Sequence, residues 1–314
     1  MLRSLYTLAS PAGPRGGLSV LIFHRVLAQA DPLFPQETDA RRFDAVCGWL
    51  RDWCNVLPLD TAVRRLQEGR LPARALAITF DDGYADNHDV ALPILARHGL
   101  AATFFVATGF LDGGRMWNDT LIESLRRTPL AKLDVEGLGA GVPTFEVDTA
   151  AQKRAAIDTL IAHAKYMQVH ARERFVDEVA RRCRVEPPGE LMLSSQQVRQ
   201  LRAAGMQIGA HTVSHPILAR LPAEGARQEI LASKKVLESL LQEPIGLFAY
   251  PNGKPERDYG VEAVDIVREC GFDAAFSTAP GVARTGADPY QLPRFTPWDH
   301  TRTRFGLRLI RNAA

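Results

Sequence analysis

Two adjacent carboxylates are the first residues whose types and spacing could do chemistry. Asp81 and Asp82 directly follow the apolar run at residues 75–80, and Gly83 permits a sharp turn behind them. Neighbouring carboxylates repel each other unless a cation or a proton lies between them. A lone Asp-Asp-Gly is also typical of a polar turn that closes a strand. The pair therefore indicates either a turn or a cation site.

Two histidines four residues apart follow a second apolar run. His211 and His215 come after residues 206–210, and Pro216 interrupts the chain behind them. Imidazoles at this spacing can face one metal ion, although an isolated pair also arises by coincidence. One carboxylate and two histidines form a three-ligand site with positions open for water and substrate. The remaining aspartate is then available as a general base for the hydrolysis of an amide or ester.

A third apolar run, at residues 246–250, ends in the turn Pro-Asn-Gly at residues 251–253. By itself this is only a turn. The three motifs together, each directly behind an apolar run and in this order, are far more specific than any one of them.

The elements that must position these residues are short apolar runs that alternate with helical segments. Runs that are apolar almost throughout are typical of strands buried on both faces of a parallel sheet covered by helices. Catalytic groups in α/β barrels lie at the carboxyl ends of the strands, where the three motifs stand. We therefore predict an α/β fold, a (β/α) barrel of about seven or eight strands. The candidate strands are residues 18–23, 55–59, 75–80, 102–108, 206–210, 246–250, 273–277 and 290–295.

Helices between the strands are predicted from apolar spacing and end signals. Phe43, Val46, Leu50 and Trp53 share one helical face. Ser194 followed by Gln197 predicts a capping box at a helix start. Glycines with positive φ are expected to end helices at Gly69, Gly99, Gly205 and Gly271.

The alternation lapses at about residues 117–190, where helical segments at 119–127 and 150–182 flank a glycine-rich loop at 137–143. We expect this stretch to be a helical insertion on a barrel that spans residues 18–300. Residues 1–17 are then an N-terminal extension, and residues 301–314 are a C-terminal tail.

Composition excludes several classes of protein. The chain has 314 residues, of which 46% are hydrophobic, which suffices for a large core. A net charge of +2, without basic runs interleaved with aromatics, argues against nucleic-acid binding. The longest uncharged apolar stretch, residues 99–111, is too short to span a membrane. The N-terminus lacks the apolar region of a signal peptide, so we expect a cytoplasmic protein.

The three motifs resemble those of the polysaccharide deacetylases, also called the NodB-homology family or carbohydrate esterase family 4. They are Thr-Phe-Asp-Asp-Gly at residues 79–83, His-Thr-Val-Ser-His-Pro at 211–216 and Tyr-Pro-Asn-Gly at 250–253. The resemblance spans roughly residues 18–295. It implies a distorted (β/α) barrel and a metal-dependent hydrolase that removes N-acetyl groups from an amino-sugar polysaccharide or saccharide precursor.

The resemblance also implies roles for single residues. Asp81 would be the catalytic base, and Asp82, His211 and His215 would hold one divalent ion. Such mixed ligation suits Zn²⁺, and also Co²⁺, Ni²⁺ or Mn²⁺.

The third motif would bind substrate through Tyr250 and Asn252, with the backbone N–H of Asn252 in the oxyanion hole. Trp117, at the start of the insertion, either lines a sugar subsite by stacking or packs within the insertion.

Two departures from the common family pattern affect the site. Ala249 stands where the third motif usually has an arginine that tunes the base, and we predict that Arg294 replaces it. The late motif with a general-acid histidine is missing, since His300 is the only histidine after Cys270.

A circularly permuted branch, which includes poly-N-acetylglucosamine deacetylases, carries an equivalent histidine on its first strand. His24, in the run Phe-His-Arg-Val, resembles that arrangement. It is either the general acid or a histidine satisfied by a backbone carbonyl.

Two other functions stay open at this point. A metal-dependent amidase acting on a small non-sugar amide would use the same residues. A saccharide-binding homologue without turnover would keep the fold but is expected to lose one of the four motif residues, all of which are present.

Overall fold

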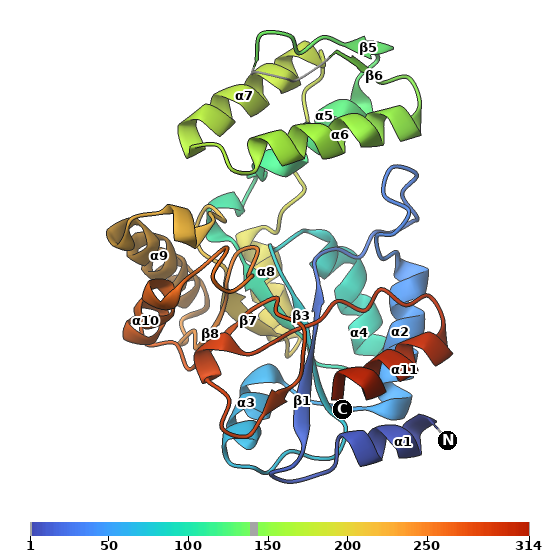
Figure 1. Ribbon diagram of the computed structural model, residues 1–314, viewed down its shortest axis with the longest axis vertical. Helices are drawn as coiled ribbons and strands as arrows, with labels where there is room; N and C mark the ends of the chain where they lie inside the picture. The colour runs from blue at the N-terminus through green and yellow to red at the C-terminus, as the bar shows by residue number, and fades with distance from the viewer. Residues whose placement is uncertain (1, 139–143, 314) are drawn as a thin grey trace. The chain divides into compact units, whose positions relative to one another are not determined.

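The computed structural model describes residues 2–138 and 144–313 and divides into two compact units (Figure 1). The first unit comprises residues 1–29, 38–112 and 192–314, and the second comprises residues 30–37 and 113–191. All three motifs belong to the first unit.

The first unit is built on one curled, mostly parallel sheet. Its strands follow the order β10, β1, β3, β4, β7, β8, β9, with β2 paired to the start of β3. Only the pair of β1 and β10 is antiparallel among these pairings. The predicted α/β fold with a distorted barrel is confirmed. The strands are β1 (Gly17–Phe23), β2 (Asn55–Val56), β3 (Ala75–Phe80), β4 (Thr103–Val106), β7 (Gln207–Ala210), β8 (Leu247–Ala249), β9 (Ala274–Phe276) and β10 (Ala283–Arg284).

The predicted strand at residues 290–295 differs from the structure. A short 3-10 helix, η4 (Pro289–Gln291), is followed by two isolated bridges, from Leu292 to Phe276 and from Phe295 to Leu21. Pro293 lies between them and has no N–H to donate to a continuous ladder. The segment therefore links β9 to β1 without forming a regular strand.

The alternating side chains of β3 enter two different cores. Leu76, Ile78 and Phe80 belong to a large apolar cluster that also contains residues of α2 (Ala40–Trp53) and α4 (Leu92–His98). Ala75 and Ala77 belong to a smaller cluster with α3 (Leu59–Gln67). Because side chains alternate along a strand, Thr79 and then Asp81 continue the face of these two alanines.

The predicted helix ends and the predicted capping box are confirmed. Gly69, Gly99, Gly205 and Gly271 have φ values of +64°, +64°, +85° and +72°. Ser194 forms the predicted capping box with Gln197 at the start of α8 (Ser195–Ala203). Two more helices, α9 (Ala223–Leu241) and α10 (Val261–Glu269), also pack on the large cluster.

The two ends of the chain are helical. Helix α1 (Leu2–Ala9) and helix α11 (Arg302–Ala313) contact each other and lie side by side in Figure 1.

The second unit has its own core, formed by α5 (Trp117–Arg127), α6 (Ala150–Ala164) and α7 (Val169–Arg182). The helical stretch predicted at residues 150–182 is thus two helices, with a turn between Lys165 and Gln168. A small antiparallel pair, β5 (Lys132–Leu133) and β6 (Phe145–Glu146), was not predicted. Residues 139–143 of the predicted glycine-rich loop lie outside the described residues.

No helix within residues 2–138 and 144–313 combines the length and apolar character that a membrane crossing needs.

Candidate active site

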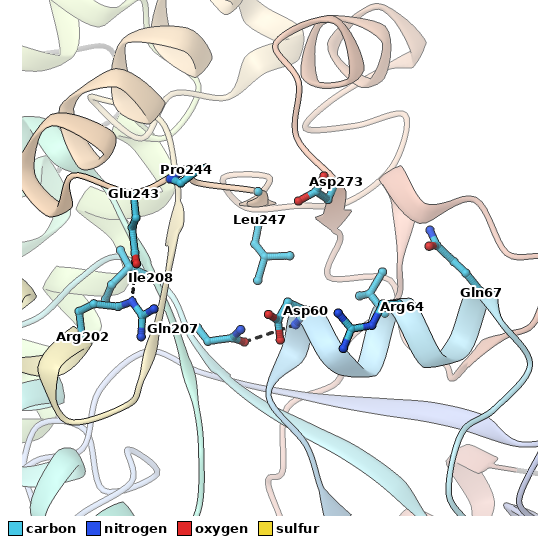
Figure 2. A pocket seen from close by; sticks show the side chains of 12 residues that line it. Asp60, Arg64, Gln67, Arg202, Gln207, Ile208, Glu243, Pro244, Leu247 and Asp273 are labelled. Carbon is cyan, nitrogen blue, oxygen red and sulfur yellow. Dashed lines mark hydrogen bonds and ion pairs between the residues drawn. The ribbon is translucent and has the colours of Figure 1, made fainter.

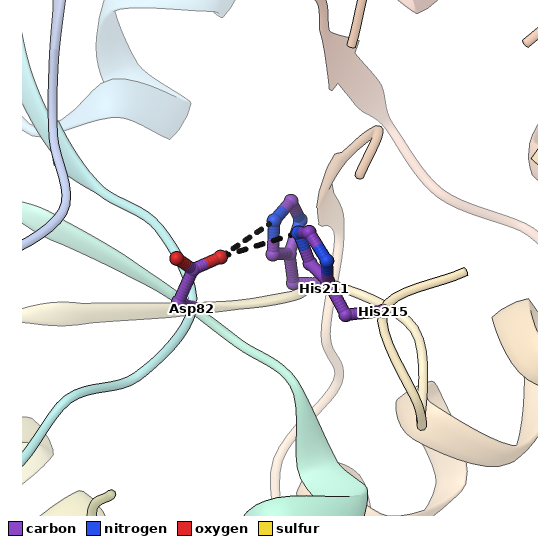
Figure 3. Close-up of side chains that lie close together, drawn as sticks. All are labelled: Asp82, His211 and His215. Atoms are coloured by element: carbon purple, nitrogen blue, oxygen red, sulfur yellow. Dashed lines mark ion pairs between the residues drawn. The ribbon is translucent and has the colours of Figure 1, made fainter. Parts of the chain in front are cut away.

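The fold brings the first two motifs together at the carboxyl ends of two parallel strands that flank β4. Asp82 follows β3 and His211 follows β7, on either side of β4. Figure 3 shows the rings of His211 and His215 facing the carboxylate of Asp82. One ligand atom from each of these three residues lies within 4.8 Å of the others.

The spacing of these atoms fits a divalent metal ion. Oδ1 of Asp82 lies 3.4 Å from Nε2 of His211 and 3.3 Å from Nε2 of His215. Zinc bonds to nitrogen and oxygen of about 2.0–2.2 Å place neighbouring ligand atoms of a tetrahedral site about 3.3–3.6 Å apart. Two imidazole nitrogens and one carboxylate oxygen are also a donor set that zinc and similar ions accept.

A hydrogen bond behind His211 prepares its ring for ligation. Nδ1 of His211 lies 2.7 Å from the carbonyl oxygen of Ala249, the last residue of β8. Because a carbonyl only accepts, Nδ1 carries the proton of the neutral ring, and Nε2 then has its lone pair on the side of Asp82. This arrangement is typical of histidines that bind metals.

The charges of the cluster shift the pKa values of its members. Burial lowers the pKa of His215 to about 4, against the attraction of Asp82, so the ring is neutral at neutral pH. Burial also disfavours protonated His211, but Asp81 and Asp82 outweigh it and raise the pKa of this ring above its ordinary value. Burial disfavours ionised Asp82, yet the two histidines bring its pKa below the ordinary value. Asp82 is therefore a carboxylate that attracts positive charge.

Asp81 is held by Arg294, the residue predicted to replace the missing arginine of the third motif. Nη1 and Nη2 of Arg294 each donate to one carboxylate oxygen of Asp81 at 2.7 Å. Nη1 also contacts Oγ1 of Thr79 at 3.1 Å, and Nε donates to the carbonyl of Ser277 at 3.0 Å. Burial opposes the ionisation of Asp81, but Arg294 and His211 outweigh it, so the pKa of Asp81 lies below its ordinary value.

His24 follows β1, whose end pairs with the end of β3. Its side chain is exposed, and its charge acts on the pKa values of Asp81, Asp82 and His215. Its ring has no hydrogen-bond partner in the part of the chain that the structure describes, so no backbone carbonyl satisfies it there. Its own carbonyl accepts a bond of 2.9 Å from Nδ2 of Asn87.

Two residues that the sequence analysis did not single out hold the segment around His24. The half-buried carboxylate of Asp86 accepts from Nε of Arg25 at 2.8 Å and from the backbone N–H of Val26 at 3.1 Å. The fully buried Asn87 contacts the carbonyl of His24. The sequence offered one signal for these two residues: Asp86 and Asn87 are a second pair of adjacent polar residues, which begins three residues after Gly83.

Tyr250 does not present its side chain to a substrate, which corrects the prediction. The residue is fully buried, its ring stacks on Tyr259 with centroids 3.8 Å apart, and its hydroxyl donates to the carbonyl of Tyr290 at 2.9 Å. Its neighbours in the core therefore occupy both its ring and its hydroxyl.

Asn252 differs from Tyr250 because its backbone is available. It has a φ of +58°, and its carbonyl accepts from Oγ1 of Thr278 at 2.8 Å. Its N–H donates to no acceptor among the described residues. A free N–H at a strand end is what an oxyanion site requires.

Trp117 belongs to the second unit, where it begins α5 and is half-buried. The guanidinium of Arg172 lies 5.0 Å from the centre of its ring. This packing occupies one face of the ring, and a sugar-stacking role for Trp117 stays a prediction.

A cavity of about 450 Å³ lies elsewhere in the first unit (Figure 2). Its lining includes Gln207 and Leu247, the first residues of β7 and β8, together with Arg64 of α3. It is thus at the amino ends of the strands, opposite to the ends that carry Asp82, His211 and His215.

Comparison with known proteins agrees with the fold and the motifs. The family model described as polysaccharide deacetylase matches residues 68–132 and 143–275. YxkH of Bacillus subtilis (strain 168), whose name gives polysaccharide deacetylase as a provisional assignment, is 20% identical over 279 residues. That match covers 88% of this chain and 70% of YxkH.

Solved structures share the fold at low sequence identity. The deacetylase PplD of Streptococcus pyogenes, in complex with acetate, has a TM-score of 0.62 and 18% identity, and the match covers 95% of this chain and 98% of PplD. IcaB from Ammonifex degensii has a TM-score of 0.61 and 20% identity, with the same two coverages. The matched family model, which spans the first motif and the second, shows that the chain belongs to the polysaccharide deacetylase family and is a hydrolase that acts on carbon–nitrogen bonds.

Proposed function

We propose that this protein is a metal-dependent N-deacetylase that removes acetyl groups from an N-acetylated amino-sugar saccharide. The observation that carries the proposal is that the two adjacent aspartates have different partners. Asp82 faces His211 and His215, whereas Asp81 is held by Arg294. One carboxylate is therefore available to a metal ion and the other to a proton.

The metal ligands in this proposal are Asp82, His211 and His215, and zinc is the ion that suits them best. A bound divalent ion supplies Lewis-acid chemistry, because it polarises an acyl oxygen and makes water a better nucleophile at neutral pH.

Asp81 is the general base in this proposal. The two bonds from Arg294 keep the carboxylate ionised and fix its orientation, while a carboxylate has about four lone-pair sites and so retains capacity for a water molecule. In the reaction, the water oxygen adds to the acyl carbon and one water proton passes to Asp81.

His24 and Asn252 complete the reaction. The N–H of Asn252 stabilises the negative oxygen of the tetrahedral intermediate. As the carbon–nitrogen bond breaks, the leaving nitrogen needs a proton, which the imidazolium of His24 donates. The products are acetate and a free amino sugar. His24 is also the residue in which this chain resembles the circularly permuted branch. Membership of the chain in that branch is part of the proposal.

The family, described as polysaccharide deacetylase, and the provisional name of YxkH support a saccharide substrate. IcaB and PplD share the fold over 95% of this chain, and PplD was solved with acetate, the acid that deacetylation releases.

The test is acetate release from chitooligosaccharides and from poly-N-acetylglucosamine fragments, with a small N-acetyl amide as the comparison substrate. We expect release from a saccharide that stops with a chelator and returns when zinc is restored. Release from the small amide alone would identify an amidase instead. Saccharide binding without release would identify an inactive homologue.

A further inference from the structure

The loop that joins His211 to His215 is held in an unusual backbone conformation. Thr212 has a φ of +66° and His215 a φ of +54°, a region that residues with side chains seldom adopt. For a β-branched residue such as Thr212 this conformation is strained and persists only when surrounding contacts enforce it. Some part of the structure must therefore hold the loop.

The carbonyl groups of the loop are held by a neighbouring 3-10 helix. The N–H groups of Thr108 and Gly109, in the 3-10 helix η2 (Thr108–Phe110), donate to the carbonyls of Thr212 and Val213 at 3.1 and 2.8 Å. A side chain at position 109 would start only 2.8 Å from the Val213 carbonyl oxygen, so glycine permits this approach.

The N–H groups of the loop are held by one carboxylate. Oε2 of Glu229, on α9, accepts from the backbone N–H groups of Val213 and Ser214 at 2.9 and 2.8 Å. Oε1 accepts from the hydroxyl of Ser214 at 2.6 Å. Successive N–H groups that converge in this way form an anion-binding nest, and here the protein fills the nest with its own carboxylate.

We propose that Glu229 is a positioning residue of the metal centre, an inference that rests on the function proposed above. Glu229 fixes the backbone of Val213 and Ser214, and thereby keeps Nε2 of His215 at 3.3 Å from Asp82. His211 is held independently, because it extends β7 and bonds to Ala249. Loss of Glu229 therefore loosens one of the three ligands and leaves the other two in place.

Substitutions at Glu229 and its partners separate this role from general stability. Glu229→Ala removes all three bonds, Glu229→Gln keeps the shape and one acceptor oxygen, and Ser214→Ala removes only the hydroxyl bond. The matched control is Glu224→Gln, an exposed residue of the same helix whose carboxylate contacts Gln228.

The first readout is the zinc affinity of the full chain, measured by competition with a chromogenic chelator. Outer contacts of this kind change metal affinity by about 10- to 100-fold. We expect that loss for Glu229→Ala, a smaller loss for Glu229→Gln, and values near wild type for Ser214→Ala and Glu224→Gln. The second readout is hydrogen exchange at Val213 and Ser214 in the metal-free protein, which should accelerate in Glu229→Ala and not in Glu224→Gln.

The outcomes distinguish this inference from the proposed function. A wild-type protein that binds zinc, together with a Glu229→Ala variant that binds it equally well, contradicts the role of Glu229 alone. Unchanged exchange at Val213 and Ser214 contradicts it as well. A wild-type protein that binds no divalent ion contradicts the proposed metal centre, and with it any positioning of a ligand by Glu229.

Discussion

Arg294 binds both carboxylate oxygens of Asp81 at 2.7 Å, although 213 residues separate the two in the sequence. The side chain of Arg294 is fully buried and is held in addition by Thr79 and by the carbonyl of Ser277. Ala249, which stands at the usual place of the motif arginine, instead offers its carbonyl to His211. Arg294, in the segment that follows η4, thus supplies the arginine that the third motif lacks.

Removing Arg294 should strongly destabilise the fold. In Arg294→Met the carboxylate of Asp81 stays buried without its partner, and breaking a buried ion pair from one side typically costs about 3–5 kcal/mol. We expect a fall of this size in the free energy of unfolding, measured by urea denaturation of the metal-free protein. Arg304→Met, an exposed substitution in α11, is the control. Equal stability of the two variants would show that the pair contributes little.

The stability of the metal-free protein should depend on the ionisation of Asp81. Because the pKa of Asp81 is lowered in the folded state, its contribution is complete above the unfolded value of about 3.9 and is lost as the pH falls through the folded value. Unfolding free energies of wild type and Asp81→Asn should therefore differ by a constant amount above about pH 5, and the difference should shrink below about pH 4. A difference that already shrinks between pH 7 and pH 5 would indicate a raised pKa.

Asp81→Asn should separate metal binding from catalysis. The amide cannot accept the water proton, so we expect turnover to fall on the order of 10²-fold or more while the metal content stays at the wild-type level. Acetate release and elemental analysis of the same preparation check both statements. Loss of the metal in this variant would reverse the roles of Asp81 and Asp82.

His24→Ala should impair amide hydrolysis more than ester hydrolysis. An amide nitrogen must be protonated before it leaves, whereas the leaving group of an activated ester departs without a proton. We expect normal metal content, a severe loss of N-deacetylation and a smaller loss on an activated acetate ester. Equal losses on the two substrates would indicate a structural role, and wild-type amide turnover would refute the assignment.

The parts of the fold that depend on local patterns could be predicted from the sequence. The run at residues 75–80 is apolar except for Thr79 because both of its faces are buried, and β3 has these same bounds. The glycine stops at Gly99 and Gly271 were predictable because only the local backbone decides a positive φ at a helix end. Asp82, His211 and His215 could be placed near strand ends because their motifs directly follow apolar runs. Parallel strands then bring those ends together.

The parts that depend on distant contacts could not be predicted in the same way. The burial of Tyr250 results from its stacking on Tyr259 and its bond to Tyr290, and neither partner is marked by the Tyr-Pro-Asn-Gly motif. Glu229 looks like any polar residue of an amphipathic helix, because its role depends on N–H groups of the loop before that helix. Pro293 was visible in the sequence, and its missing N–H explains why residues 290–295 do not form a regular strand.

The metal content of His215→Ala tests whether Asp82, His211 and His215 hold a catalytic divalent ion. The wild-type protein and the variant are saturated with zinc, freed of unbound metal by gel filtration and compared by elemental analysis. We expect about one zinc ion per wild-type chain and almost none in the variant, whose acetate release is lost as well. Full zinc occupancy in His215→Ala would contradict this assignment.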